Sequence, residues 1–135
     1  MSISYFEANL NEIIEVVRNI LIENPKIIIA VLFGSALKRK LVRDIDIGYI
    51  AIPKLSFAEN VRISTKIEEM IRIPIDFIPL DETSPLLRYH AFSKGIKIIV
   101  KNNLLFYNYL SEAFMELNDI SIKLNNIKVS YNKLI

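Results

Sequence analysis

Two aspartates separated by a single residue begin an apolar segment of the chain, Asp44 and Asp46 in "RDIDIGYIAI". Residues i and i+2 of a strand point to the same face of a sheet, so we expect both carboxylates to project together. Two carboxylates this close raise the pKa of at least one of them unless a cation lies between them. Such oxygen ligands suit Mg²⁺ or Mn²⁺. The pair alone is also typical of a turn followed by an edge residue that faces water.

A third aspartate, Asp76, interrupts the apolar run "IPIDFIPL" between Ile75 and Phe77. Burying an unpaired carboxylate costs free energy, so we expect Asp76 to have a partner or a metal ion. If the strands around Asp46 and Asp76 are neighbours, Asp76 reaches the face that holds Asp44 and Asp46. The sequence then predicts a metal site of three carboxylates. The alternative is a strand-end aspartate that contacts solvent or a lysine.

The pair Gly34-Ser35 follows an apolar run and precedes "ALKRKL". Glycine lets a phosphate approach the backbone closely, and the free N–H groups at a helix start attract anions. Taken alone, the pair is better explained by a tight turn with Ser35 as helix cap, and the phosphate interpretation gains weight only because the acidic pair follows closely in the sequence. We therefore expect a phosphate site beside the carboxylates. The chain contains neither a Walker motif nor a dinucleotide-binding glycine motif.

"LFGSALKRKLVRDIDIGYI", with "PIDFIPL" after it, resembles the G-S…D-x-D signature and third aspartate of the DNA polymerase β-type nucleotidyltransferases. The chain length and "LLRYHAFSKGIKIIVKN" resemble the minimal nucleotidyltransferases (MNT), which are commonly antitoxins paired with a HEPN-domain ribonuclease toxin. The resemblance spans residues 27–102. It implies that Gly34 and Ser35 hold the triphosphate, that Asp44 and Asp46 bind metal, and that Asp76 completes the catalytic and metal-binding triad.

The resemblance also implies an activity and a partner. Family members transfer a nucleotide, notably AMP from ATP, to a hydroxyl, which in the antitoxins belongs to a tyrosine of the HEPN toxin. Here only eight residues separate Ser35 from Asp44, fewer than the family usually has, and a usual glycine is missing. This leaves open an alternative, a weak or inactive antitoxin that neutralises its toxin by binding alone. An antibiotic- or RNA-modifying enzyme is less favoured because no substrate domain follows the core.

The composition narrows the chemistry further. With no cysteine and one histidine, catalysis is expected to use carboxylates, hydroxyls and bound metal. A net charge of +2 is too small to predict direct nucleic-acid binding. No signal peptide and no apolar run long enough for a membrane span are visible, so we expect a cytoplasmic protein without membrane contact.

Helical and strand periodicities alternate along the chain, and the length fits one domain over residues 1–135. We expect an α/β (α+β) nucleotidyltransferase fold, with a mixed or antiparallel sheet of about four strands flanked by helices. The first helix is expected to include Phe6, and a short helix to begin at Ser35. A last helix from about residue 103, with an apolar stripe that reaches Tyr131, is expected to pack on the core rather than on a partner, although both remain open. Lys38, Arg39 and Lys40 are expected to form a solvated helix face, although contact with phosphate or with a partner remains open. His90 is expected to be a surface or packing residue.

Overall fold

The computed structural model describes residues 4–134, with side chains placed as far as residue 129. Within these residues one sheet has the strand order β5-β4-β2-β6. Its strands are β2 (Ile27–Phe33), β4 (Ile45–Ala51), β5 (Ile75–Pro79) and β6 (Ile96–Val100). β2 runs antiparallel to β4 and β6, whereas β4 and β5 are parallel. The predicted mixed sheet is confirmed, and residues 1–3 and 135 of the predicted domain lie outside the described part.

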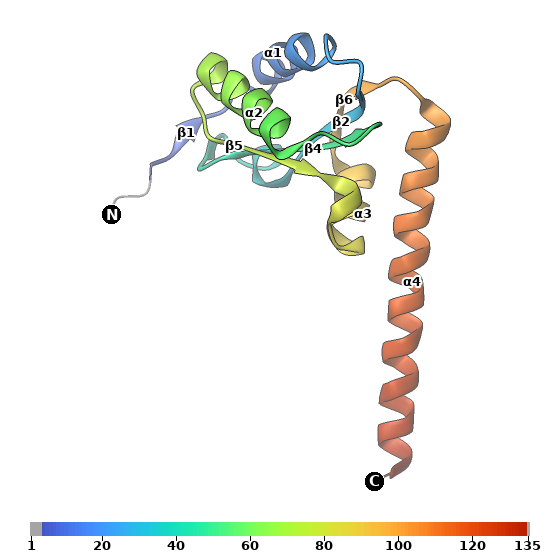
Figure 1. The fold of residues 1–135 in the computed structure, drawn as a ribbon. Helices are drawn as coiled ribbons and strands as arrows, with labels where there is room; N and C mark the ends of the chain where they lie inside the picture. Colours follow the sequence, from blue (N-terminus) through green and yellow to red (C-terminus); the bar gives the residue numbers. More distant parts are fainter. Residues whose placement is uncertain (1–3, 135) are drawn as a thin grey trace.

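Helices cover both faces of this sheet (Figure 1). α1 (Leu10–Leu21) and α2 (Phe57–Ile71) pack on one face, and α3 (Pro85–Lys94) packs with the start of α4 (Asn103–Leu134) on the other. The α2 start is a capping box between Ser56 and Glu59, which satisfies two backbone donors of the first turn. No helix within residues 4–134 is both long and apolar enough to cross a membrane.

The structure differs from the predicted elements near the N-terminus and after β2. Phe6 is not helical but belongs to β1 (Phe6–Glu7), which pairs with β3 (Leu41–Val42) in a small second sheet. Such short strands leave no periodic signal in the sequence. The predicted short helix is a single 3₁₀ turn, η1 (Gly34–Leu37), whose cap is Phe33 rather than Ser35. The predicted cap of this element was therefore wrong by two residues.

The prediction that α4 packs on the core is right only for its first part. Phe106 and Ala113 are buried, whereas every residue from 118 to 129 is exposed. α3 is only ten residues long, so it can cover only the beginning of a 32-residue helix. The remainder extends away from the body of the molecule (Figure 1). Tyr131, in the predicted stripe, has a side chain outside the described residues.

A side chain of α2 contacts both of the parallel strands β4 and β5. The Asn60 side-chain amide donates to the Tyr49 hydroxyl at 2.9 Å and to the Phe77 carbonyl at 3.0 Å. The rings of Tyr49 and Phe77 stack with centroids 4.2 Å apart. Asn60 thus joins both strands to one helix, close to the sheet edge that carries the aspartates.

We predict that Asn60→Ala lowers the free energy of unfolding by about 1–3 kcal/mol, because the change leaves the Phe77 carbonyl without this partly buried donor. Urea unfolding followed by circular dichroism measures the loss. Asn118→Ala, at an exposed position of α4, is the control and should change stability much less. Equal losses in the two variants would show that Asn60 does not hold the strands.

Candidate metal and nucleotide site

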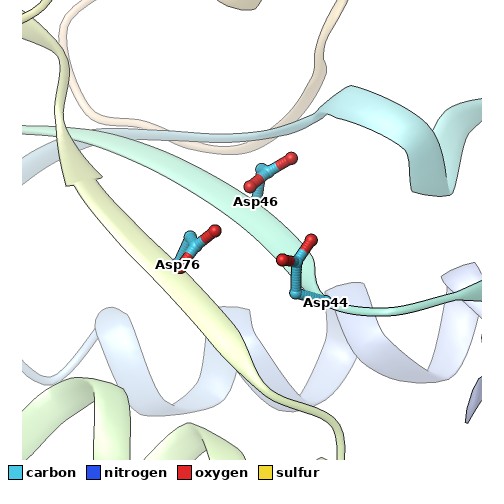
Figure 2. Close-up of side chains that lie close together, drawn as sticks. All are labelled: Asp44, Asp46 and Asp76. Atoms are coloured by element: carbon cyan, nitrogen blue, oxygen red, sulfur yellow. The ribbon is translucent and has the colours of Figure 1, made fainter. Parts of the chain in front are cut away.

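Three aspartates from two neighbouring strands meet at one edge of the sheet. Asp44 directly precedes β4, Asp46 is the second residue of β4, and Asp76 is the second residue of β5. Asp46 and Asp76 are register partners in the parallel pair. One carboxylate oxygen from each of the three lies within 4.8 Å of the others (Figure 2). The structure therefore brings together the three carboxylates that the sequence predicts as a triad.

The burial of Asp76 differs from the expectation. Its side chain is exposed, while its neighbours Ile75 and Phe77 are buried. β5 is an edge strand, and alternate residues of a strand point to opposite faces, so the aspartate can face solvent while its neighbours enter the core. The argument that a buried Asp76 requires a partner is thus wrong, although the side chain does lie beside Asp46.

Asp46 has the most perturbed electrostatic environment of the three. Burial, followed by the negative charges of Asp44 and Asp76, raises its pKa from 3.8 to about 6. Each of these causes disfavours the ionised carboxylate. A positive ion among the three groups would remove the repulsion and restore the charged form.

Gly34 lies against this carboxylate. Its backbone has φ +82°, a conformation that side-chain-bearing residues rarely adopt, and a Cβ placed on it would lie 2.2 Å from Asp46 Oδ2. The close approach follows from the register, because the preceding residue, Phe33, pairs with Asp46 across β2 and β4. A glycine is therefore required here for two independent reasons. Ser35 follows it at an exposed position.

Asp46, Gly34 and Ser35 line a common cavity of about 540 Å³. Basic side chains enter it from two directions: Lys38 and Arg39 from the segment after η1, and Lys94 from α3. Its remaining lining residues are Phe33, Leu37, Leu87 and His90. The cavity combines a carboxylate edge, positive charge and an apolar wall, which is the set of contacts that a nucleotide needs.

Several of these lining residues were not predicted as part of a site. Lys38 and Arg39 were expected to form a solvated helix face and His90 to be a surface or packing residue, and Lys94 carried no prediction. Leu87, His90 and Lys94 follow at spacings of three and four, which puts them on one side of a helix. That spacing was visible in the sequence, but nothing there indicated that this side of α3 faces Gly34 and Ser35.

The donor set fits a divalent cation. Mg²⁺ prefers carboxylate oxygens at about 2.1 Å, which keeps its ligand atoms within about 4.2 Å of one another. The 4.8 Å spread of the three oxygens is close to this limit, so small side-chain rotations would complete the contacts. The repulsion that raises the pKa of Asp46 is the effect that such a cation would offset.

The mixed sheet and the acidic edge define a nucleotidyltransferase-type fold. The sequence matches the family described as Polymerase beta, Nucleotidyltransferase over residues 15–104, two thirds of the chain. The chain therefore belongs to the polymerase β nucleotidyltransferase family. No curated protein gives a significant match.

Solved structures share the fold at low sequence identity. A chain of a toxin–antitoxin complex with AMP-PNP has a TM-score of 0.72 and 18% identity, over 87% of this chain and 96% of that one. A chain of the toxin–antitoxin MntA–HepT gives 0.70 and 16%, over 89% and 97%. A chain from the complex of a tri-AMPylated HEPN toxin and MNT antitoxin of Shewanella oneidensis gives 0.65 and 19%, over 89% and 92%.

We predict that Asp46→Asn stabilises the metal-free protein at pH 7.5. The folded-state pKa of about 6 lies above the ordinary 3.8, so the folded chain binds the proton more tightly, and stability falls as pH rises from about 4 to 6. Removing the carboxylate should recover about 1–2 kcal/mol, roughly half of what the pKa difference implies, because the group is only half-buried.

Urea unfolding in the presence of a chelator at pH 7.5 and pH 4 checks this expectation. The gain should disappear at pH 4, where the wild-type carboxyl is protonated. Asp119→Asn, on the exposed part of α4, is the matched control and should give no gain at either pH. A gain of the same size at both pH values would contradict the electrostatic explanation.

Proposed function

We propose that the chain is a metal-dependent nucleotidyltransferase that transfers AMP from ATP to a hydroxyl of a partner protein. The observation that carries this proposal is the meeting of Asp44 and Asp76 with Asp46, which itself lines a cavity together with Gly34, Ser35 and three basic side chains. The carboxylates would hold Mg²⁺ or Mn²⁺. Bound there, the cation would offset the charge of the triphosphate and lower the pKa of the acceptor hydroxyl.

The residues of the cavity have separate tasks in this proposal. Gly34 leaves room for phosphate beside Asp46, and Ser35 offers a hydroxyl donor to it. η1 has only one turn, so positive charge for the phosphates would come from side chains such as Lys94 rather than from a helix dipole. These contacts would hold the α-phosphate in line with the acceptor oxygen.

Asp76 is suited to the proton transfer, because it is the exposed member of the triad. In the proposed reaction the acceptor oxygen forms a bond to the α-phosphorus of ATP. The bond from that phosphorus to the bridging oxygen breaks, and pyrophosphate leaves with the electron pair. The acceptor proton passes to the Asp76 carboxylate.

The proposed partner is a HEPN-type toxin, with this chain as its antitoxin in the cytoplasm. Support comes from the shared fold with chains of toxin–antitoxin complexes, one of which contains an AMPylated HEPN toxin and another AMP-PNP. The acceptor in the partner would be a tyrosine hydroxyl, as the family resemblance suggests.

Incubating the purified protein with α-labelled ATP, Mg²⁺ and a HEPN protein encoded beside it tests the transfer. We expect label on the HEPN protein, dependent on Mg²⁺, and a loss of about 100-fold or more in Asp44→Asn and Asp46→Asn. Asp119→Asn should transfer as wild type does. Transfer that survives both site substitutions would reject the proposed site.

The same experiment distinguishes the alternative of an antitoxin that acts by binding alone. In that case the protein inhibits the toxin's ribonuclease activity without ATP, Asp46→Asn inhibits equally well, and calorimetry detects no ATP binding. This combination of results would reject nucleotide transfer while leaving the toxin as partner.

We further predict that Lys94→Ala raises the KM for ATP about tenfold and changes kcat little, since loss of a charge-assisted phosphate contact weakens substrate binding. Initial rates at varied ATP concentration measure both constants. Lys66→Ala, which removes an exposed lysine from α2 on the other face of the sheet, is the control. An unchanged KM in the Lys94 variant would exclude this side chain from the ATP site.

A further inference from the structure

Seven of the apolar residues of α4 follow a regular pattern. They recur at alternating intervals of four and three, which gives a seven-residue repeat over the described part of the helix: Phe106, Leu110, Ala113, Leu117, Ile120, Leu124 and Ile127. A repeat of this period forms the contact line between two helices of a coiled coil. We call this line the α4 seam.

The first part of the seam already packs in this manner within the chain. α3 lies against it in the antiparallel direction, with Phe92 next to Phe106 (5.5 Å between ring centroids) and Tyr89 next to Phe114 (6.0 Å). Glu116 flanks the seam and forms an ion pair with Arg88 of α3. This half therefore shows both features of a helix pair, an apolar line and a charged pair beside it.

The second part of the seam has no partner among the described residues. Ile120, Leu124 and Ile127 are 44%, 61% and 64% exposed. From residue 118 to its end the helix extends about 25 Å. Helices of this length draw most of their stability from packing of an apolar face, so an unpaired seam here calls for a second helix.

The lysines that flank this second part of the seam indicate which charges a partner helix would carry. Lys123 lies one heptad after Glu116 on the same side of the seam, and Lys128 lies on the other side. In a parallel pair of two α4 helices, Lys123 of one copy would face Lys128 of the other, and like charges at these positions oppose pairing. The acidic residue of this region, Asp119, lies away from the seam.

We propose that the projecting part of the α4 seam binds an α-helix of another protein, and that this helix carries an apolar heptad line flanked by glutamate or aspartate. The inference rests on α4 alone and does not require nucleotide transfer. The family match ends at residue 104, at the first turn of α4, and does not include the seam.

A designed helical peptide of about four heptads tests the surface, with leucine and isoleucine on its apolar line and glutamate at both flanking positions. Calorimetric titration should detect binding of this peptide to the full-length protein. A second peptide with lysine at the same flanking positions should bind at least about tenfold more weakly, since every flanking pair becomes repulsive. The double variant Lys123→Glu, Lys128→Glu should reverse this preference.

Matched variants distinguish peptide binding by the seam from binding by other parts of the helix. Leu124→Gln, on the seam, should abolish peptide binding, whereas Ile122→Gln, at another exposed apolar position that lies off the seam, should retain it. Asp46→Asn should also bind the peptide, which keeps this test independent of the catalytic proposal.

Two results would overturn the proposal. Equal binding of the two peptides, or no binding of either, would show that the seam does not select an acidic helix. Sedimentation that shows a dimer of the protein alone, lost in Leu124→Gln, would show that the seam joins two copies of this chain instead.

Discussion

The parallel pairing of β4 with β5 places Asp46 beside Asp76, and the proposed chemistry depends on this register. The pairing brings like charges together, so it must be held by forces outside the carboxylates. Alternate residues of the two strands supply them: Ile45, Ile47 and Phe77 enter the core. Asn60 adds a polar connection from α2 to both strands. The acidic edge is thus an unfavourable arrangement that the apolar side of the same strands maintains.

A second constraint acts where β2 ends. The antiparallel register sets Phe33 opposite Asp46, so the chain must leave the sheet directly beside a carboxylate. A Cβ there would displace the Asp46 carboxylate, and the left-handed backbone of Gly34, which favours glycine, turns the chain toward η1 at the same point. The cavity wall begins at this turn. Its shape is therefore determined by the strand register as much as by the residues of the short segment itself.

The features predicted correctly from sequence are those that depend on a short local pattern of residue types. The alternating Asp-Ile pattern predicted a shared face for Asp44 and Asp46, and a β-branched run predicted β2. The exposure of Asp76 could not be predicted, because it depends on β5 being an edge strand. His90 and Lys94 needed the packing of α3 against the sheet, which no local pattern encodes. The short strands β1 and β3 form by pairing with each other and by packing of Phe6 and Val42 on the core, so neither has a local signal of its own.

α3 has two occupied sides, and this has a mechanical consequence. Leu87, His90 and Lys94 face the cavity, while Arg88, Tyr89 and Phe92 contact α4. The helix is a single layer between the cavity beside Asp46 and the first part of α4. A rotation or tilt of α3 that improves packing on one side displaces side chains on the other. The packing of α3 on α4 and the shape of the cavity wall are therefore coupled. A partner that binds the far end of α4 and tilts it would also move the side of α3 that lines the cavity.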